Sequence, residues 1–193
     1  MSDFIARFIA VLRVALRWNT TALLLFVSTS VVAADNPSYS SQAKQLLVPA
    51  VDSAAQPGFF QDVKIEFVQG DLWRLVTAQE SVRITNAIER VELIKTDSFP
   101  VQIFLKVSGI FTSGCPEVGQ ISQLLEGNSF NVAVYLKNSM WLLHPELVDC
   151  AAVMVPFSRT IPLPVYGLSA GEYAYRVNDE HQGSFRLAVD NRL

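Results

Sequence analysis

The sequence is poor in the side chains on which most catalytic and metal sites depend. Its 193 residues include only two histidines and two cysteines. The cysteines do not form a Cys-x-x-Cys pair, which removes the usual zinc and thiol-exchange motifs. No glycine-rich phosphate loop precedes an expected helix. We therefore expect a protein that is not an enzyme and that has no catalytic residues, bound metal or other cofactor.

Positive charge is also scarce. The formal net charge is −3, and the sequence has no run of lysine or arginine. Proteins that bind nucleic acid use a basic face to displace counterions from the phosphates. We therefore expect no nucleic-acid partner.

The first 34 residues have the pattern of a signal peptide. Arg7, Arg13 and Arg17 precede an apolar run from Thr21 to Val32. This run is shorter than the about 20 residues that span a bilayer, and small residues at its end offer a cleavage site before Asp35. Cleavage would leave a periplasmic or extracellular protein with no membrane span in the mature chain. The alternative is an uncleaved anchor in the inner membrane.

Two cysteines follow this segment, Cys115 and Cys150. Because exported proteins enter an oxidising compartment, the pair predicts one disulfide bond. Cys115 follows one expected strand and Cys150 precedes another, and such strand ends can meet at one edge of a sandwich. The alternative is two free thiols.

The rest of the chain divides into a tail and a domain. Residues 35–58 are rich in Ser, Ala, Gln and Pro without sustained periodicity, which predicts a flexible tail. From residue 59, short runs alternate between apolar and polar side chains, as half-buried strands do. These runs lie at 63–67, 72–76, 82–84, 88–94, 101–107, 121–125, 130–136, 152–157, 160–165, 173–177 and 184–189. They predict one domain over 59–193, an all-β, immunoglobulin-like β-sandwich preceded by a signal peptide and a flexible N-terminal tail.

Several turns are marked by their residues. Gly127 and Asn128 favour the positive φ of a tight hairpin between the runs at 121–125 and 130–136. Three prolines between 156 and 164 lack an N–H donor, which places that segment at a sheet edge or where a strand changes sheets.

A corner is expected at Gly167-Leu168-Ser169-Ala170-Gly171. Its two glycines bracket a reversal in which a side chain with a Cβ atom is not expected to fit. Tyr173 follows and should bury its ring while its hydroxyl bonds to nearby backbone, as in a tyrosine corner. This pattern indicates a structural role for the corner.

Residues 87–190 resemble a family of exported bacterial domains that form small immunoglobulin-like sandwiches. The shared features are the two cysteines, the Gly127–Asn128 hairpin and the Gly-Leu-x-Ala-Gly-x-Tyr corner. The resemblance implies a sandwich and lends no catalytic residues. At 178–183 the chain departs from the short Asn-Gly turn that is usual in the family.

The remaining polar and aromatic residues are weak candidates for a site. His144 and Glu146 have a spacing that could hold a metal, but a metal site needs three or four ligands, so a solvated loop is favoured. Trp73 and Trp141 are expected in the core. The alternative for Trp141, which lies beside Met140 in a long loop, is an exposed position.

The expected function follows from the loops. Loops of a sandwich commonly carry recognition, which makes 137–149 and 178–183 the best candidates for a binding surface. We expect an exported, non-catalytic interaction or structural module of the bacterial cell envelope, whose partner is an envelope protein or a cell-surface polymer. The alternative is a secreted or periplasmic inhibitor of a hydrolase that acts through the 137–149 loop.

We predict that the mature chain begins at or near Asp35, because small residues at a cleavage site follow the short apolar run. Intact-mass analysis of protein purified from cells checks this. A mass that retains residues 1–34 would show an uncleaved anchor instead.

Overall fold

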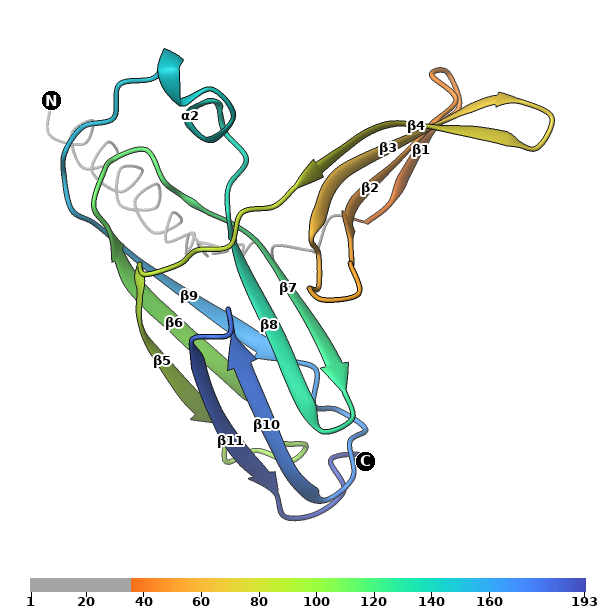
Figure 1. Ribbon diagram of the computed structural model, residues 1–193. Coiled ribbons are helices and arrows are strands. Elements are labelled where there is room, and N and C mark those ends of the chain that lie inside the picture. The colour runs from red at the N-terminus through yellow and green to blue at the C-terminus, as the bar shows by residue number, and fades with distance from the viewer. Residues whose placement is uncertain (1–35) are drawn as a thin grey trace, which may run out of the picture. The chain divides into compact units, whose positions relative to one another are not determined.

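The computed structural model describes residues 36–193, which form three β-sheets and little helix (Figure 1). The strands are β1 (Ser38–Ser40), β2 (Gln45–Val51), β3 (Phe60–Gln69), β4 (Leu72–Glu80), β5 (Ile88–Lys95), β6 (Ile103–Phe111), β7 (Val118–Glu126), β8 (Ser129–Leu136), β9 (Val155–Leu163), β10 (Gly171–Val177) and β11 (His181–Leu187). A helical turn, α2 (Met140–Leu143), and a 3-10 turn, η1 (Pro145–Leu147), separate β8 from β9. The predicted signal peptide lies outside the described residues. In the part of the chain that is described, no helix is long and apolar enough to cross a membrane.

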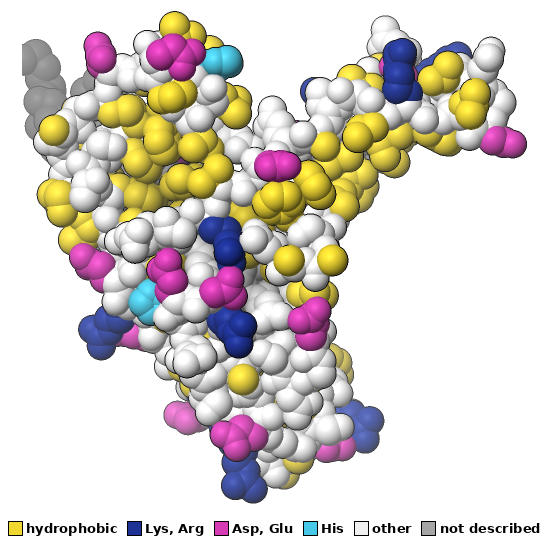
Figure 2. Space-filling model, viewed as in Figure 1, with side chains coloured by type: hydrophobic (Ala, Val, Ile, Leu, Met, Phe, Trp, Pro, Cys, Tyr) yellow, Lys and Arg dark blue, Asp and Glu magenta, His cyan; other side chains and the backbone are white. Residues whose placement is uncertain are grey.

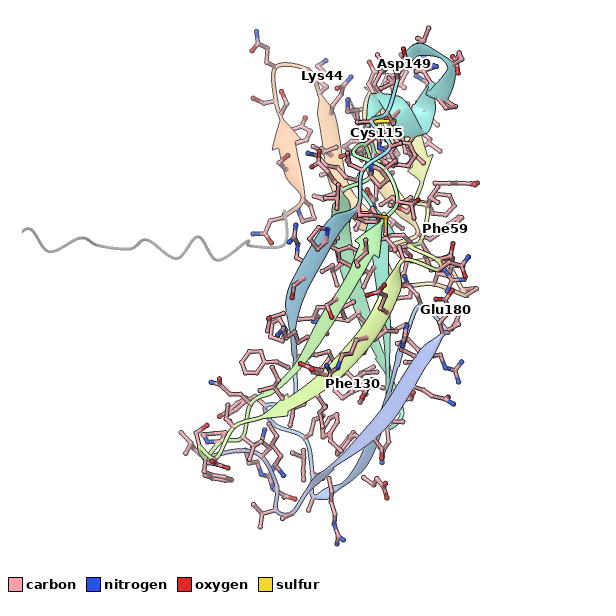
Figure 3. All side chains as sticks on the ribbon, turned by 90° about the vertical axis from the view of Figure 1, so that its left-hand side faces the viewer. Lys44, Phe59, Cys115, Phe130, Asp149 and Glu180 are labelled. Atoms are coloured by element: carbon pink, nitrogen blue, oxygen red, sulfur yellow. A yellow bond between two sulfur atoms is a disulfide. The ribbon has the colours of Figure 1, made fainter. Side chains whose placement is uncertain are left out.

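Strands β5 to β11 form the predicted sandwich. One sheet has the order β5-β6-β9 and the other has the order β11-β10-β8-β7. Alternate residues of β6 are buried, including Leu105 and Val107, and they meet Phe130 and Val134 of β8 in one hydrophobic core. Figure 3 labels Phe130, whose side chain is fully buried. The alternation of apolar and polar residues thus places one face of each sheet in the core, and the all-β sandwich is confirmed.

One pairing departs from the immunoglobulin topology. Strands β8 and β10 are parallel, with Phe130 opposite Tyr175, whereas the sheets of an immunoglobulin domain are antiparallel. The cause is the order of strands, because the second strand of the β7–β8 hairpin, and not the first, lies beside β10.

The glycine, asparagine and proline residues correctly predicted the hairpin and the edge strand. Gly127 and Asn128 join β7 to β8, and Gly127 has a φ of 58°. The segments predicted as two strands at 152–157 and 160–165 form one strand, β9, which among the described strands pairs only with β6. An edge position tolerates its prolines, since a proline there need not donate to a neighbour.

The run predicted as a strand at 82–84 contributes only an isolated bridge between Arg83 and Tyr135. It therefore serves as the connection between β4 and β5.

The predicted corner is present between β9 and β10. Tyr173 is 6% exposed, and its hydroxyl donates a hydrogen bond to the carbonyl of Ser169 at 3.0 Å. Gly167 has a φ of 84°, where glycine is favoured. The expectation for Gly171 is wrong, because a Cβ atom there would lie 3.7 Å from the Tyr173 ring, an ordinary contact.

The flexible tail predicted over 35–58 is corrected by the structure. This stretch contains β1 and β2, which join β3 and β4 in a separate sheet of order β1-β2-β3-β4. The alternation of Leu46, Val48 and Ala50 indicates a strand, but it is short and lies among Ser, Ala and Pro residues. The sandwich consequently begins at β5, and residues 60–80 belong to the other sheet.

A buried asparagine closes one end of the sandwich. Asn178, in the β10–β11 turn, accepts a hydrogen bond on Oδ1 from the Val134 N–H at 2.8 Å. Its Nδ2 donates to the carbonyls of Ile84 and Val134 at 2.8 and 2.9 Å. The side-chain amide therefore joins the turn to β8 and to the β4–β5 connection.

A second asparagine closes the other end. Asn191 is 1% exposed, and its Oδ1 accepts from the Val101 N–H at 2.7 Å. Its Nδ2 donates to the carbonyls of Val101 and Val165 at 2.9 and 3.0 Å. The C-terminal segment is thereby fixed to the start of β6 and the end of β9.

We predict that Asn178→Ala lowers the free energy of unfolding by about 2–4 kcal/mol. The change leaves the buried Val134 N–H and Ile84 carbonyl without their Asn178 partner, removes one of two bonds to the Val134 carbonyl, and places alanine at a φ of 48°. Urea unfolding followed by tryptophan fluorescence measures the loss. Asn131→Ala, which removes an exposed bond to Glu126, is the control and should cost less than about 1 kcal/mol. Equal losses in the two variants would contradict the prediction.

Candidate interaction surface

The segment from Lys137 to Met154, here called the stapled loop, carries α2 and η1 away from the end of β8. The N–H of Lys137 donates to the Glu117 carbonyl at 2.9 Å, and their side chains form an ion pair at 2.8 Å. Gly119 permits this approach, because a Cβ atom there would lie 2.6 Å from the Lys137 Cα. The start of the stapled loop is therefore held against β7.

The far end of the stapled loop is held covalently. Cys115 and Cys150 form a disulfide with Cα atoms 5.4 Å apart, which is a usual separation for a bridged pair. Figure 3 labels Cys115 beside this bond. The Gly114 N–H donates to the Ala151 carbonyl at 2.9 Å next to it. The predicted disulfide is confirmed, and neither cysteine is free.

Between these two attachments the stapled loop exposes apolar side chains. Met140, Leu143 and Leu147 are 60%, 50% and 69% exposed, and Val153 and Met154 lie exposed just beyond the disulfide. Figure 2 shows hydrophobic side chains gathered over this region and along the β1–β4 sheet. Contiguous apolar groups on a protein surface commonly mark interaction sites, and methionine adapts its shape to varied partners.

Buried polar atoms without partners gather where the stapled loop meets β3 and β4. Asn138 Nδ2 donates to Oε1 of Gln61 at 3.2 Å and of Gln79 at 3.1 Å. Among residues 36–193, the buried side-chain polar atoms that lack a hydrogen-bond partner are Gln61 Nε2, Asn138 Oδ1, Ser139 Oγ and Trp141 Nε1. They belong to β3 and to the first residues of the stapled loop, where Trp141 is partly buried and not part of the sandwich core.

Tyr135 fixes the same junction from the sandwich side. Its fully buried hydroxyl donates to the Pro57 carbonyl at 2.6 Å, which joins β8 to the segment before β3. Burial raises the pKa of Tyr135 above its ordinary value of 10.0, with a smaller rise from Asp52 and an opposing effect of Arg83.

The β1–β4 sheet has an apolar face that sequence analysis did not identify. Opposed residues in neighbouring strands share a face, and the register forms a row across all four strands: Tyr39, Leu46, Ile65 and Leu75. The next positions along the strands add Val48, Val63, Phe67 and Trp73. We call these eight residues the apolar face. Trp73 was expected in the core but is 52% exposed and contacts Phe67 edge-on at 5.3 Å between ring centroids.

The other face of this sheet is mixed, with charged residues beside Leu47, which opposes Lys64. Lys64, Glu66 and Arg74 lie on it, and Arg74 pairs with Glu66 at 2.7 Å. These three charged side chains therefore lie on the side of the sheet opposite the apolar face.

The candidate metal residues lie at the tip of the stapled loop. His144 Nδ1 and Glu146 Oε1 are 3.5 Å apart, and both side chains are exposed. Within the described residues, no three His, Cys, Asp or Glu side chains group closely enough to hold a metal. His181 lies apart at the start of β11, where its Nε2 is 3.1 Å from the Ile88 carbonyl. The pair at 144 and 146 therefore provides two of the three or four ligands that a site requires.

The corner matches the letters Gly-x-Ser-x-Gly at residues 167–171. A nucleophile elbow with that pattern needs a sharp turn from a strand into a helix. Here the segment joins β9 to β10, two strands, and Ser169 serves Tyr173 with its backbone carbonyl. The corner therefore has the geometry of a turn between two strands and not that of a nucleophile elbow.

Comparison with known proteins finds relatives of the sandwich. Residues 105–187 match the family model described as the ORF11 beta-sandwich domain. The uncharacterized 10.2 kDa protein in the HgiBIM 5' region of Herpetosiphon aurantiacus is 30% identical over 82 residues, which cover 42% of this chain and 92% of that protein. The corresponding HgiCIIM protein of the same organism is 28% identical over 92 residues, which cover 48% of this chain and 90% of that protein. No solved structure matches the chain significantly.

We predict that Tyr135→Phe removes a dependence of stability on high pH. A raised folded-state pKa favours the protonated phenol, so stability is fully present below pH 10.0 and falls as pH rises above it. The variant loses the bond to Pro57, which costs about 1–3 kcal/mol at neutral pH. Urea unfolding between neutral pH and alkaline pH measures both effects. A decline that persists unchanged in the variant would assign it to another group.

Proposed function

This chain belongs to the ORF11 β-sandwich domain family, and we propose that it is an exported, non-catalytic interaction module of the bacterial cell envelope. Its binding surface in this proposal is the stapled loop, which presents Met140, Leu143 and Leu147 to a partner.

The proposal rests on one observation. The stapled loop exposes apolar side chains at its tip and is attached to the rest of the domain at both of its ends. The Lys137–Glu117 contacts fix one end, and the Cys115–Cys150 disulfide fixes the other. A loop that is already ordered loses less conformational entropy on binding, so more of its contact energy appears as affinity. The exposed side chains between the two attachments gain free energy when a partner removes them from water.

Two observations support a location outside the cytoplasm. Disulfides persist in oxidising compartments, namely the periplasm and the extracellular space. The first 34 residues have the charge and hydropathy pattern of a signal peptide. Both observations support our proposal that the mature protein lies in the periplasm or outside the cell.

A protein is the partner that suits this surface best. The exposed groups at the tip are aliphatic and thioether side chains, which gain most against another apolar surface. Interface cores are enriched in methionine and depleted of charged residues. A sugar polymer would leave these side chains against polar hydroxyl groups.

The same geometry supports a second candidate, an inhibitor of a hydrolase. Such an inhibitor inserts a rigid segment into a cleft, and the disulfide gives the 137–149 loop a fixed end. The identity of the captured partner separates the two candidates.

The test is capture from an envelope extract with the immobilised, oxidised protein, followed by quantitative mass spectrometry of the bound species. We predict that Leu143→Ser with Leu147→Ser reduces capture by at least ~10-fold. Both leucine side chains are exposed in the free protein and would be buried against the bound partner. Val189→Ser, which removes a similarly exposed apolar side chain elsewhere, is the matched control and should retain capture.

The outcomes are distinct. A stoichiometric envelope protein that the double variant loses supports the module, and a captured hydrolase whose activity falls supports the inhibitor. Equal capture by the double variant and the wild-type protein would overturn the role of the stapled loop, as would capture of a sugar polymer alone.

A further inference from the structure

The apolar face of the β1–β4 sheet is not used by the sandwich. The hydrophobic core contains side chains from β5 to β11 and from their connections, but none from β1 to β4 in the part of the chain that is described. The family match at 105–187 also lies entirely beyond this sheet. The sheet is therefore an addition to the sandwich, and its apolar face needs a covering of its own.

From this arrangement we infer that a second copy of this chain packs on the apolar face, face to face, and forms a two-layer dimer. This inference goes beyond the proposed function because it assigns a partner to the apolar face, whose residues are not part of the stapled loop, although Asn138 at the start of that loop contacts β3 and β4 of the same sheet.

The composition of the apolar face suits its own copy. Its eight residues are all aliphatic or aromatic, from Tyr39 on β1 to Leu75 on β4. Two such sheets can stack about 10 Å apart, with side chains interdigitating as in a sandwich core. The opposite face, with the Glu66–Arg74 pair, then remains in water.

The exposed area matches the lower end of what a specific dimer needs. Tyr39, Trp73 and Leu75 are 56%, 52% and 62% exposed. With about 150–250 Å² for a whole aromatic side chain, these three residues and the partly exposed Leu46, Val48, Ile65 and Phe67 supply roughly 500 Å² per copy. Val63 is only 7% exposed and adds little. Two copies would bury on the order of 1,000 Å², which is near the minimum for a specific interface. A reversible dimer of moderate affinity is the expected result.

Light scattering after gel filtration tests this with the protein as purified from cells, its disulfide intact. The molar mass should rise from one to two times the mass found under denaturing conditions as concentration rises from ~1 to ~500 µM. A mass of one chain over this whole range would overturn the inference.

The strand β4 offers a matched pair of variants. Leu75 and Leu72 are almost equally exposed, at 62% and 61%, but Leu75 lies within the apolar face, whereas Leu72 lies at the end of β4 beyond the register shift that follows Phe67. Leu75→Lys should weaken dimerisation by at least ~100-fold, because each copy would bury a charge in place of leucine. Leu72→Lys should leave it within about threefold of the wild type. A dimer that tolerates Leu75→Lys, or one that Leu72→Lys abolishes equally, would contradict the assignment.

Trp73 provides a second readout that does not depend on mass. Its emission should shift to shorter wavelength on dimerisation, and the shift should vanish in Leu75→Lys and in Trp73→Phe. Near-ultraviolet circular dichroism confirms that the variants are folded. Since capture through the stapled loop is measured separately with an envelope extract, the dimer and the proposed function can fail independently.

Discussion

The hydrogen bonds of the Asn178 side chain are the constraint on which the arrangement of elements depends. One amide satisfies the Val134 N–H, the Val134 carbonyl and the Ile84 carbonyl, all inside the protein. A buried amide is tolerated only when its donors and acceptor are paired, so the three segments must arrive together. The next residue of β8, Tyr135, then holds Pro57 with its hydroxyl. Adjacent residues of one strand thereby join the β10–β11 turn, the β4–β5 connection and the segment before β3.

The sandwich, the stapled loop and the β1–β4 sheet differ in how well their apolar side chains are covered. The sandwich supplies a closed core, and the family match at 105–187 includes most of it. The stapled loop and the β1–β4 sheet leave apolar side chains in water, which costs free energy unless another surface covers them. The parts that are least favourable in isolation are therefore those for which we propose partners.

The sequence predicted features that depend on local chemistry. The Gly127–Asn128 hairpin, the Tyr173 corner and the prolines of the β9 edge follow from backbone geometry that few other residues allow. The disulfide was predicted because the chain has two cysteines and an oxidising compartment was expected. The parallel β8–β10 pair was not predictable, because either strand of a hairpin can satisfy the same alternation. The apolar face was missed because its row draws Tyr39, Leu46, Ile65 and Leu75 from four strands, and register links them only in space. The stapled loop was located, whereas the exposure of Leu143 and Leu147 depends on how α2 and η1 are oriented.

The Cys115–Cys150 bond closes a covalent ring that contains the β7–β8 hairpin and most of the stapled loop. The exposed tip of that loop is the kind of site that proteases attack first. A single backbone cut between the two cysteines opens the ring but releases no fragment, because the sulfur bridge still connects both pieces. The cut ends also stay close to their original positions through the Lys137–Glu117 and Gly114–Ala151 contacts. At the location proposed for this protein, outside the cytoplasm, the ring would therefore let the exposed tip of the stapled loop be cut once without loss of either piece.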